Sequence, residues 1–443
     1  MIKFYITVLL LFINLAFSFG QKETFFKDVA PIIYNKCAPC HRTGEAAPFN
    51  LISYEDVAKR ASFIKDVIST GYMPPWRADS HYTSSPFSNV RMLTTTEKKT
   101  IISWIDNKMP KGNEVKSTTE ILNKYHEGTR YSRKPDAVLS VNKPFVVKGD
   151  NAERFIVFKI PFEFDKLQNV EAIEFISKNK KVIHHTNFAI YDVPENVPIN
   201  TSPDFINNTV GETDESQIAY APLKTNMVYY GGWIPGTGYE SYPKDIGWTM
   251  PKRGVILLTI HYAPVGKDEI DLSGVNFFFT PAPIKRVIDV INFGSGGVAE
   301  EEITPYFMIP ADSVRKFKLV VSNPEKQSIM AVWPHMHLLG KSFKAYAITP
   351  QQDTLKLISI PEWDFNWQEL YKYKKPIIVP EGSRLIVEGV YDNTKNNPKN
   401  PSNPPKMVFG GGEMKTKDEM MTMLLLYLPY KEGDEDLNLE DQK

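Results

Sequence analysis

The chain has only two cysteines, and both belong to one short motif. Cys37 and Cys40 are followed at once by His41 in the run C-A-P-C-H. Two thiols at this spacing can add to the vinyl groups of a haem, and the adjacent histidine then lies beneath the ring as an axial ligand. A disulfide, a thioredoxin-like redox pair and a chance pair of thiols are the alternatives. The histidine directly after the second cysteine favours one covalently attached haem c.

A sixth haem ligand could come from the run G-Y-M-P-P-W. Met73 lies there in a proline-stiffened loop that cannot be helical, and a thioether held in such a loop could bind the open side of the haem. Met73 could equally be a core methionine, and three other residues could take its place: Met92, Met109 and His81.

Helical patterns surround this motif. Residues 23–35 are apolar at helical spacing, and Ser53 can cap a helix over 54–69 that Gly71 ends. Thr94 and Glu97 form a capping box that opens a last helix. Residues 21–112 therefore resemble a single-haem class I cytochrome c, which is a small all-α domain.

Five of the eight histidines lie in or beside apolar, strand-like runs. They are His184 and His185 in V-I-H-H-T-N-F, His261 in L-L-T-I-H-Y, and His335 and His337 in W-P-H-M-H. Burying imidazoles is costly unless their ring nitrogens are bonded, and a metal ion would bond them.

The alternation of side chains along a strand determines which of these histidines can face the same ion. Residues two apart in a strand share a face, so His335 and His337 can hold one ion together. Adjacent residues point to opposite faces, so His184 and His185 can share an ion only if the backbone bends or if they use different ring nitrogens. Taken alone, His261 fits a hydrogen-bonded core residue better than a ligand.

Short runs of β-branched and aromatic residues alternate with turn residues from about Asp136 to Tyr430, which is typical of β-sandwiches. About 290 residues suggest two such domains. We therefore predict a multidomain chain in which a small all-α cytochrome c domain precedes two all-β, jelly-roll-like sandwiches. The run 393–406 is a polar loop too rich in proline to pair. The predicted parts are a signal peptide 1–20, a cytochrome domain 21–112, a linker 113–136, sandwiches 137–283 and 284–431, and a solvated acidic tail 432–443 without function.

Composition limits the partners and the location. The 443 residues are 42% hydrophobic, which excludes wholesale disorder, and 52 basic residues balance 52 acidic ones, which argues against nucleic acid. Lys3, the apolar run 4–19 and the site S-F-G before Gln21 predict a secretory signal peptide. No other stretch reaches 18 apolar residues, so we expect a protein without a stable membrane anchor, secreted into a bacterial periplasm.

The order of motifs after residue 143 resembles the copper type II, ascorbate-dependent monooxygenases. Beside the histidines, the resemblance rests on G-G-W-I-P-G-T-G (231–238), Y-P-K (242–244), Y-D-N-T (391–394) and D-E-M (418–420). It implies one copper on His184, His185 and His261, and a second, oxygen-side copper on His335, His337 and Met420. A thioether favours Cu(I), the state that meets dioxygen. Three nearby methionines are alternatives to Met420: Met414, Met421 and Met423.

Two departures from that family matter. Its members normally carry disulfides, whereas both cysteines here belong to the haem motif. The peptide-amidating branch binds its substrate carboxylate with an arginine, an asparagine and a tyrosine, and this chain has Trp333, Thr422 and Leu424 in those places. A glycine-extended peptide is therefore not the expected substrate.

The expected function is a secreted copper monooxygenase that uses O₂ to hydroxylate an aliphatic or benzylic C–H bond of a small organic substrate. The resemblance implies that His335, His337 and Met420 form the catalytic site and that an ascorbate-like reductant or a redox protein supplies electrons, while the fused cytochrome suggests that they pass through the haem. One alternative is a non-catalytic periplasmic electron-transfer or copper-binding protein. Another is a nitrite or oxide reductase, which would need a free cysteine for a blue-copper site.

Overall fold

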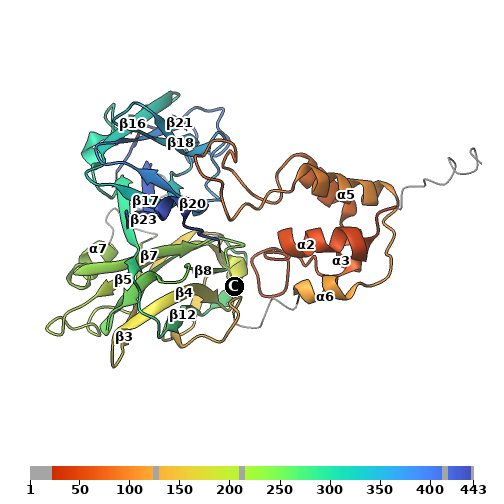
Figure 1. The fold of residues 1–443 in the computed structure, drawn as a ribbon, viewed down its shortest axis with the longest axis horizontal. Coiled ribbons are helices and arrows are strands. Elements are labelled where there is room, and N and C mark those ends of the chain that lie inside the picture. The colour runs from red at the N-terminus through yellow and green to blue at the C-terminus, as the bar shows by residue number, and fades with distance from the viewer. Residues whose placement is uncertain (1–21, 123–128, 209–214, 412–417, 441–443) are drawn as a thin grey trace, which may run out of the picture. The chain divides into compact units, whose positions relative to one another are not determined.

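The computed structural model describes residues 22–122, 129–208, 215–411 and 418–440. Its contacts divide the chain into two units (Figure 1). Of the described residues, the first unit contains 22–41, 49–74 and 92–122, and the second contains 42–48, 75–91 and those from 129 onward. The predicted signal peptide lies outside the described residues, and so does Met414.

The first unit is helical. Its core is formed by apolar residues of the helices and of the loops that join them, among them Phe25, Ile33, Leu51 and Trp104. The helices are η1 (Phe25–Val29), α2 (Ala30–Lys36), α3 (Tyr54–Ala58), α4 (Ala61–Ser69), α5 (Thr95–Asp106) and α6 (Lys116–Leu122).

The predicted caps of this unit are confirmed. The Thr94 hydroxyl accepts a hydrogen bond from the Glu97 amide at 3.1 Å, and the Glu97 carboxylate accepts one from the Thr94 amide at 2.7 Å. Ser53 caps α3 by accepting from the Asp56 amide at 3.1 Å. The helix predicted over 54–69 is instead two helices, because Arg60 leaves helical geometry with φ −114° and ψ 12°.

Two facing sheets form the first sandwich of the second unit. One sheet has the order β1-β12-β4-β9-β13, with β8 added to β4, and the other has the order β6-β3-β10-β5-β7. The strands are β1 (Ala137–Ser140), β3 (Arg154–Glu163), β4 (Gln168–Ser177), β5 (Ile183–Asp192), β6 (Phe205–Asn207), β7 (Asn226–Trp233), β8 (Tyr239–Ser241), β9 (Ile246–Met250), β10 (Arg253–Tyr262), β12 (Ser273–Thr280) and β13 (Arg286–Val287), with the separate pair β2 (Phe145–Val147) and β11 (Glu269–Asp271). Because β13 pairs with β9, this sheet extends past residue 283.

Two further sheets form the second sandwich. Their orders are β14-β23-β17-β20 and β16-β21-β18-β19. The strands are β14 (Asp289–Gly294), β16 (Val314–Ser322), β17 (Gln327–His335), β18 (Gly340–Ile348), β19 (Thr354–Ile360), β20 (Tyr371–Val379), β21 (Arg384–Asp392) and β23 (Thr422–Pro429), with the pair β15 (Met308–Ile309) and β22 (Val408–Phe409). The described chain is thus β-rich and built from several sheets, as the sequence predicts.

One strand joins the cores of the two sandwiches. Met423 and Leu425 of β23 pack in the core of the second sandwich, whereas the alternate residues Leu424, Leu426 and Leu428 pack with the core of the first. Side chains alternate between the two faces of a strand, so β23 packs against one core with each of its faces.

Three segments outside the main sheets are also ordered. The loop 393–406 has no strand, as predicted, and Asn393 closes it by donating to the carbonyls of Ile309, Pro310 and Lys406.

Within the predicted linker, α6 forms a short helix, and Tyr131 is buried against Phe278.

The expectation of a solvated tail is wrong for Asp434, whereas Glu432, Glu435 and Asp436 are exposed as expected. Asp434 is 4% exposed, and it accepts hydrogen bonds from Arg286 at 2.7 and 2.9 Å and from the Ser328 hydroxyl at 2.6 Å. Leu437 and Leu439 pack against the first sandwich. Among all described helices, none is long and apolar enough to span a bilayer.

Candidate functional site

A β-bulge brings His184 and His185 to one face of the first sandwich. In the pairing of β5 with β10, His185 lies opposite His261, but the next residue, Tyr262, lies opposite Ile183. His184 is therefore the extra residue of a bulge, a feature that locally redirects side chains. This is the backbone bend that two adjacent histidines need in order to face one ion.

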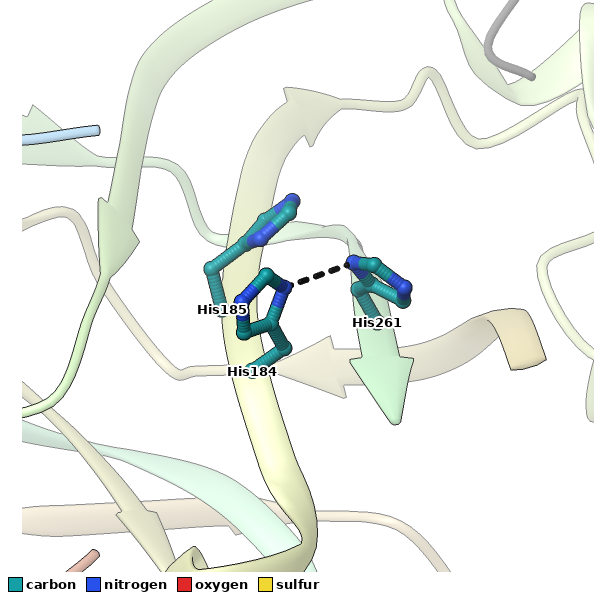
Figure 2. A group of neighbouring side chains, drawn as sticks. All are labelled: His184, His185 and His261. Atoms are coloured by element: carbon teal, nitrogen blue, oxygen red, sulfur yellow. Dashed lines mark hydrogen bonds between the residues drawn. The ribbon is translucent and has the colours of Figure 1, made fainter. Parts of the chain in front are cut away.

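The three imidazoles turn toward one another (Figure 2). His184 Nδ1 lies 3.2 Å from His261 Nδ1, and one ring nitrogen from each histidine lies within 4.8 Å of the others. Two nitrogens bound to one ion lie at most about 4 Å apart. The described cluster therefore needs only a small contraction to hold a metal.

The electrostatics of this cluster also suit a metal. Burial, and then the neighbouring His261, lower the pKa of His184 and lower that of His185 much further. His261 is 1% exposed and its Nε2 makes no hydrogen bond, while the Glu153 carboxylate lies 3.6 Å away. Lowered pKa values at His184 and His185 and a carboxylate beside His261 suit a histidine-bound cation.

The second pair of histidines lies at the end of β17. His335 is the last residue of that strand, and the His335 and His337 ring centroids are 5.0 Å apart. Burial lowers the pKa of His335 to about 4, although a hydrogen bond with Gln368 opposes the shift. His337 is 4% exposed, and its Nδ1 lies 2.8 Å from the Asp418 carbonyl oxygen. Because that carbonyl can only accept, His337 carries its proton on Nδ1.

Each residue of the D-E-M motif has its own contact. Asp418 supplies the carbonyl just described, and the Glu419 carboxylate accepts from the amides of His337 at 2.9 Å and Leu339 at 2.6 Å. Burial raises the pKa of Glu419 to about 8, and these amide bonds oppose the rise. The carbonyl of Met420 accepts from the Tyr391 hydroxyl at 2.7 Å. The motif thus holds the His337 turn beside Met420.

The methionines near this site are not equivalent. Met420 lines a cavity together with His335, whereas Met421 and Met423 are fully buried in the core of the second sandwich. Met414 lies outside the described residues. Among the described methionines this arrangement favours Met420 as the sulfur donor.

That cavity receives side chains from both sandwiches and measures about 440 Å³. A volume in this range suits a small organic molecule. Apolar, aromatic and amide side chains share its lining with His185, His335 and Met420; they include Asn187, Tyr230, Trp333, Gln368, Thr422 and Leu424.

A glycine allows the Trp333 indole to lie beside this cavity. A Cβ at Gly232 would come within 2.3 Å of the Trp333 ring and 2.5 Å of the Thr186 carbonyl oxygen. Real side chains cannot approach so closely, so glycine is required at this point of G-G-W-I-P-G-T-G.

The haem-type motif, Cys37 to His41, lies in the first unit. The loop that follows it, Arg42–Pro48, belongs to the second unit. Burial, and then Cys40, raise the pKa of Cys37 to about 12. A neutral thiol argues against a thioredoxin-like pair, which needs a lowered thiol pKa. His41 Nδ1 lies 3.1 Å from the Phe49 carbonyl oxygen, which leaves Nε2 available, and burial lowers the pKa of His41. These features fit a histidine that ligates a haem iron through Nε2.

The candidates for the sixth position are distributed over both units. Met73, Met92 and Met109 lie in the first unit with His41, while His81 lies in the second. The Met73 amide donates to the Val67 carbonyl at 3.1 Å, and Met92 is 40% exposed.

The fold and the sites define a class: a β-rich protein in which two candidate metal sites contribute to one cavity. Residues 304–439 match the model of the copper type II ascorbate-dependent monooxygenase, C-terminal domain. The chain is 25% identical to DBH-like monooxygenase protein 1 of Gallus gallus over 291 residues, which is 62% of this chain and 44% of that protein. It is 23% identical to DBH-like monooxygenase protein 1 of Homo sapiens over 341 residues, 69% of this chain and 52% of that protein.

The chain therefore spans about half the length of the curated relatives that it matches. Together these matches show that the chain is similar to the copper type II ascorbate-dependent monooxygenases, a family of oxidoreductases. Among solved structures, the major capsid protein P2 from bacteriophage PM2 aligns with a TM-score of 0.26 at 8% identity over 67% of this chain and 98% of that chain. A likeness at that level carries no argument.

Sequence reasoning missed one segment of the site. The loop Trp363–Glu369 contacts both histidine clusters through Phe365, Asn366 and Gln368. Its signal was visible as a run of aromatic and amide residues, W-D-F-N-W-Q-E, between two predicted strands.

Proposed function

We propose that this chain is a secreted, copper-dependent monooxygenase that hydroxylates a C–H bond of a small organic molecule. The reaction converts R–H, O₂, two electrons and two protons into R–OH and water. It needs one site where O₂ is reduced and a second site or partner that supplies the other electron. The single observation that carries the proposal is the cavity, because His185 of one cluster and His335 with Met420 of the other line it together.

His184, His185 and His261 would hold one copper, and His335, His337 and Met420 would hold the other. Bound copper would supply one-electron redox chemistry, and the soft thioether of Met420 favours Cu(I) at the O₂ site. The protein's own part is to present neutral imidazoles and to hold a substrate. Trp333, Tyr230 and Leu424 offer it an apolar surface, and the Asn187, Gln368 and Thr422 side chains can orient a polar group.

The proposal includes a haem c: Cys37 and Cys40 would attach it, and His41 and Met73 would hold its iron. It is supported by the motif and by the Nδ1 contact of His41. The haem would relay electrons from an ascorbate-like reductant or a redox protein. Removal of residues 1–20 during export to the periplasm belongs to the same proposal.

The first experiment counts cofactors in the purified full chain. Elemental analysis should give two coppers, and intact-mass spectrometry should give the mature chain plus one haem. A chain without copper would overturn the monooxygenase proposal, and a mass without haem would overturn the cytochrome part alone.

The second experiment measures turnover. Small benzylic compounds are incubated with ¹⁸O₂ and ascorbate, and labelled alcohol is the expected product. Met420→Leu should keep copper at the three-histidine site and lose product. Met423→Leu is the matched control, because Met423 lies in the core and a volume-conserving change there costs little. Two bound coppers without product from any compound would favour the non-catalytic alternative.

A further inference from the structure

A single loop touches both histidine clusters. Phe365, between β19 and β20, has its ring centroid 5.9 Å from that of His185 and 5.7 Å from that of His337. It also lies 5.8 Å from His184 and 6.2 Å from His261. The residues on its C-terminal side add hydrogen bonds to one histidine of each cluster.

Asn366 determines which nitrogen of His184 carries the proton. Its amide nitrogen donates to the Asp364 carboxylate at 2.9 Å, so the side-chain oxygen must be the atom that faces His184 Nε2 at 2.7 Å. An amide oxygen can only accept, which makes His184 Nε2 the donor. The neutral ring then presents an unprotonated Nδ1 to the cluster, the nitrogen that lies 3.2 Å from His261 Nδ1.

Gln368 determines which nitrogen of His335 carries the proton, and here that nitrogen is Nδ1 instead of Nε2. Its amide nitrogen donates to the Phe365 carbonyl at 2.9 Å, so its oxygen faces His335 Nδ1, with which it forms a short hydrogen bond. His335 therefore carries its proton on Nδ1 and has Nε2 free for a ligand. The Trp333 indole fixes the backbone of the same residue by donating to the Gln368 carbonyl at 3.0 Å.

Ion pairs hold the loop near both ends. Asp364 accepts from Arg77 at 2.8 Å and from Lys399 at 3.0 Å, and Glu369 pairs with Arg91 at 2.5 Å. Asp364 and Glu369 are 9% and 7% exposed, so these pairs are shielded from water. The loop is therefore held in place independently of any metal.

We propose that Asn366 and Gln368 are positioning residues that fix the tautomers of His184 and His335, so that one loop sets the ligand geometry of both copper sites. The inference rests on the assignment of these histidines as ligands in the proposed function, and it does not depend on turnover. Partners of this kind that orient metal-binding histidines contribute about 10- to 100-fold to metal affinity.

The test asks whether each of two variants loses copper affinity at only one of the two sites. Copper affinity is measured at each site by chelator competition in the full chain, with Cu(II) electron paramagnetic resonance to tell the sites apart. Asn366→Ala should weaken the three-histidine site about tenfold, since Asn366 is exposed, and leave the other site unchanged. Gln368→Ala should weaken the other site nearer to 100-fold, since Gln368 is 4% exposed.

Conservative and control variants separate positioning from folding. Asn366→Asp and Gln368→Glu keep the acceptor oxygen but lose the amide donor to Asp364 or to the Phe365 carbonyl, so they should restore part of the affinity that the alanine variants lose. Asn396→Ala and Gln351→Ala change exposed residues of the same types in the same sandwich and should alter neither site. In the metal-free chain, imidazole ¹⁵N shifts should report protonated Nε2 in His184 and protonated Nδ1 in His335, with each alanine variant disturbing only its own histidine.

The outcomes are distinct from those that test catalysis. Two coppers without turnover would remove the proposed function and leave this inference standing. Unchanged affinities in both alanine variants, an equal loss at both sites, or the opposite tautomers would overturn the inference. A wild-type chain that binds no copper would overturn both.

Discussion

Gly232→Ala tests the packing that places Trp333, and through it Gln368, beside the second histidine pair. The added Cβ would lie 2.3 Å from the indole and 2.5 Å from the Thr186 carbonyl oxygen. The indole could shift, but Thr186 belongs to the backbone of β5, to which β7 is paired. Overpacking typically costs about 1–3 kcal/mol, and a clash with backbone places this variant near the upper end.

The assay is urea unfolding monitored by tryptophan fluorescence, together with copper affinity. We expect a loss of about 2–3 kcal/mol in the free energy of unfolding. Weaker copper binding at the His335 site should accompany it, because the Trp333 indole donates to the Gln368 carbonyl. Gly266→Ala is the matched control: the nearest atom to its added Cβ, Oδ1 of Asn151, lies 3.6 Å away, so that variant should be nearly neutral.

A double variant locates the cause. In Gly232→Ala with Trp333→Phe, the smaller ring relieves part of the clash, so the combined loss should be less than the two single losses added together. The reasoning is refuted if Gly232→Ala unfolds within about 0.5 kcal/mol of the wild type, the range of an ordinary surface change.

Three further predictions follow. His261→Ala should release copper from the three-histidine site and spare the Met420 site, as elemental analysis would show by a fall from two coppers to one. Asp434→Asn should cost about 2 kcal/mol at pH 7: burial raises the pKa of Asp434, but hydrogen bonds from Arg286 and Ser328 lower it to about 2. This stabilisation is present above the unfolded pKa of 3.8 and is lost as pH falls through 2, so wild-type and variant unfolding curves should converge there. Met73→Ala should change the haem absorption spectrum and slow copper reduction without altering copper content; an unchanged spectrum would point to Met92, Met109 or His81.

The sequence predicts those parts of the site that depend on local spacing. His335 and His337 stand two apart at a strand end, and the capping box of Thr94 needs only residues within one helical turn. The β-rich class follows likewise from short apolar runs between turn residues. Each of these features is determined by neighbours in the chain.

The features that the sequence could not predict depend on distant partners. The bulge at His184 exists only in the register of β5 against β10, and a single strand does not reveal its register. Asn366 meets His184 across 182 residues, and Arg286 meets Asp434 across 148. Charge composition alone therefore predicted a solvated tail, where an ion pair with Arg286 in fact buries Asp434.

Electron transfer between the two sites depends on how far apart they stay, and the β23 leucines that pack between the two sandwiches limit that distance. Phe365 lies within 5.9 Å of both the His185 and the His337 rings, so those two rings are less than twice 5.9 Å apart. Separating the sandwiches would expose Leu424, Leu426 and Leu428, which are at most 6% exposed, at a cost of about 5–9 kcal/mol. Such a motion would be rare, so the two sites should keep a fixed, short separation during turnover. In the dicopper chain this predicts weak dipolar broadening of both Cu(II) signals, without exchange coupling, by electron paramagnetic resonance. Two independent spectra without dipolar broadening would show that the sites move apart.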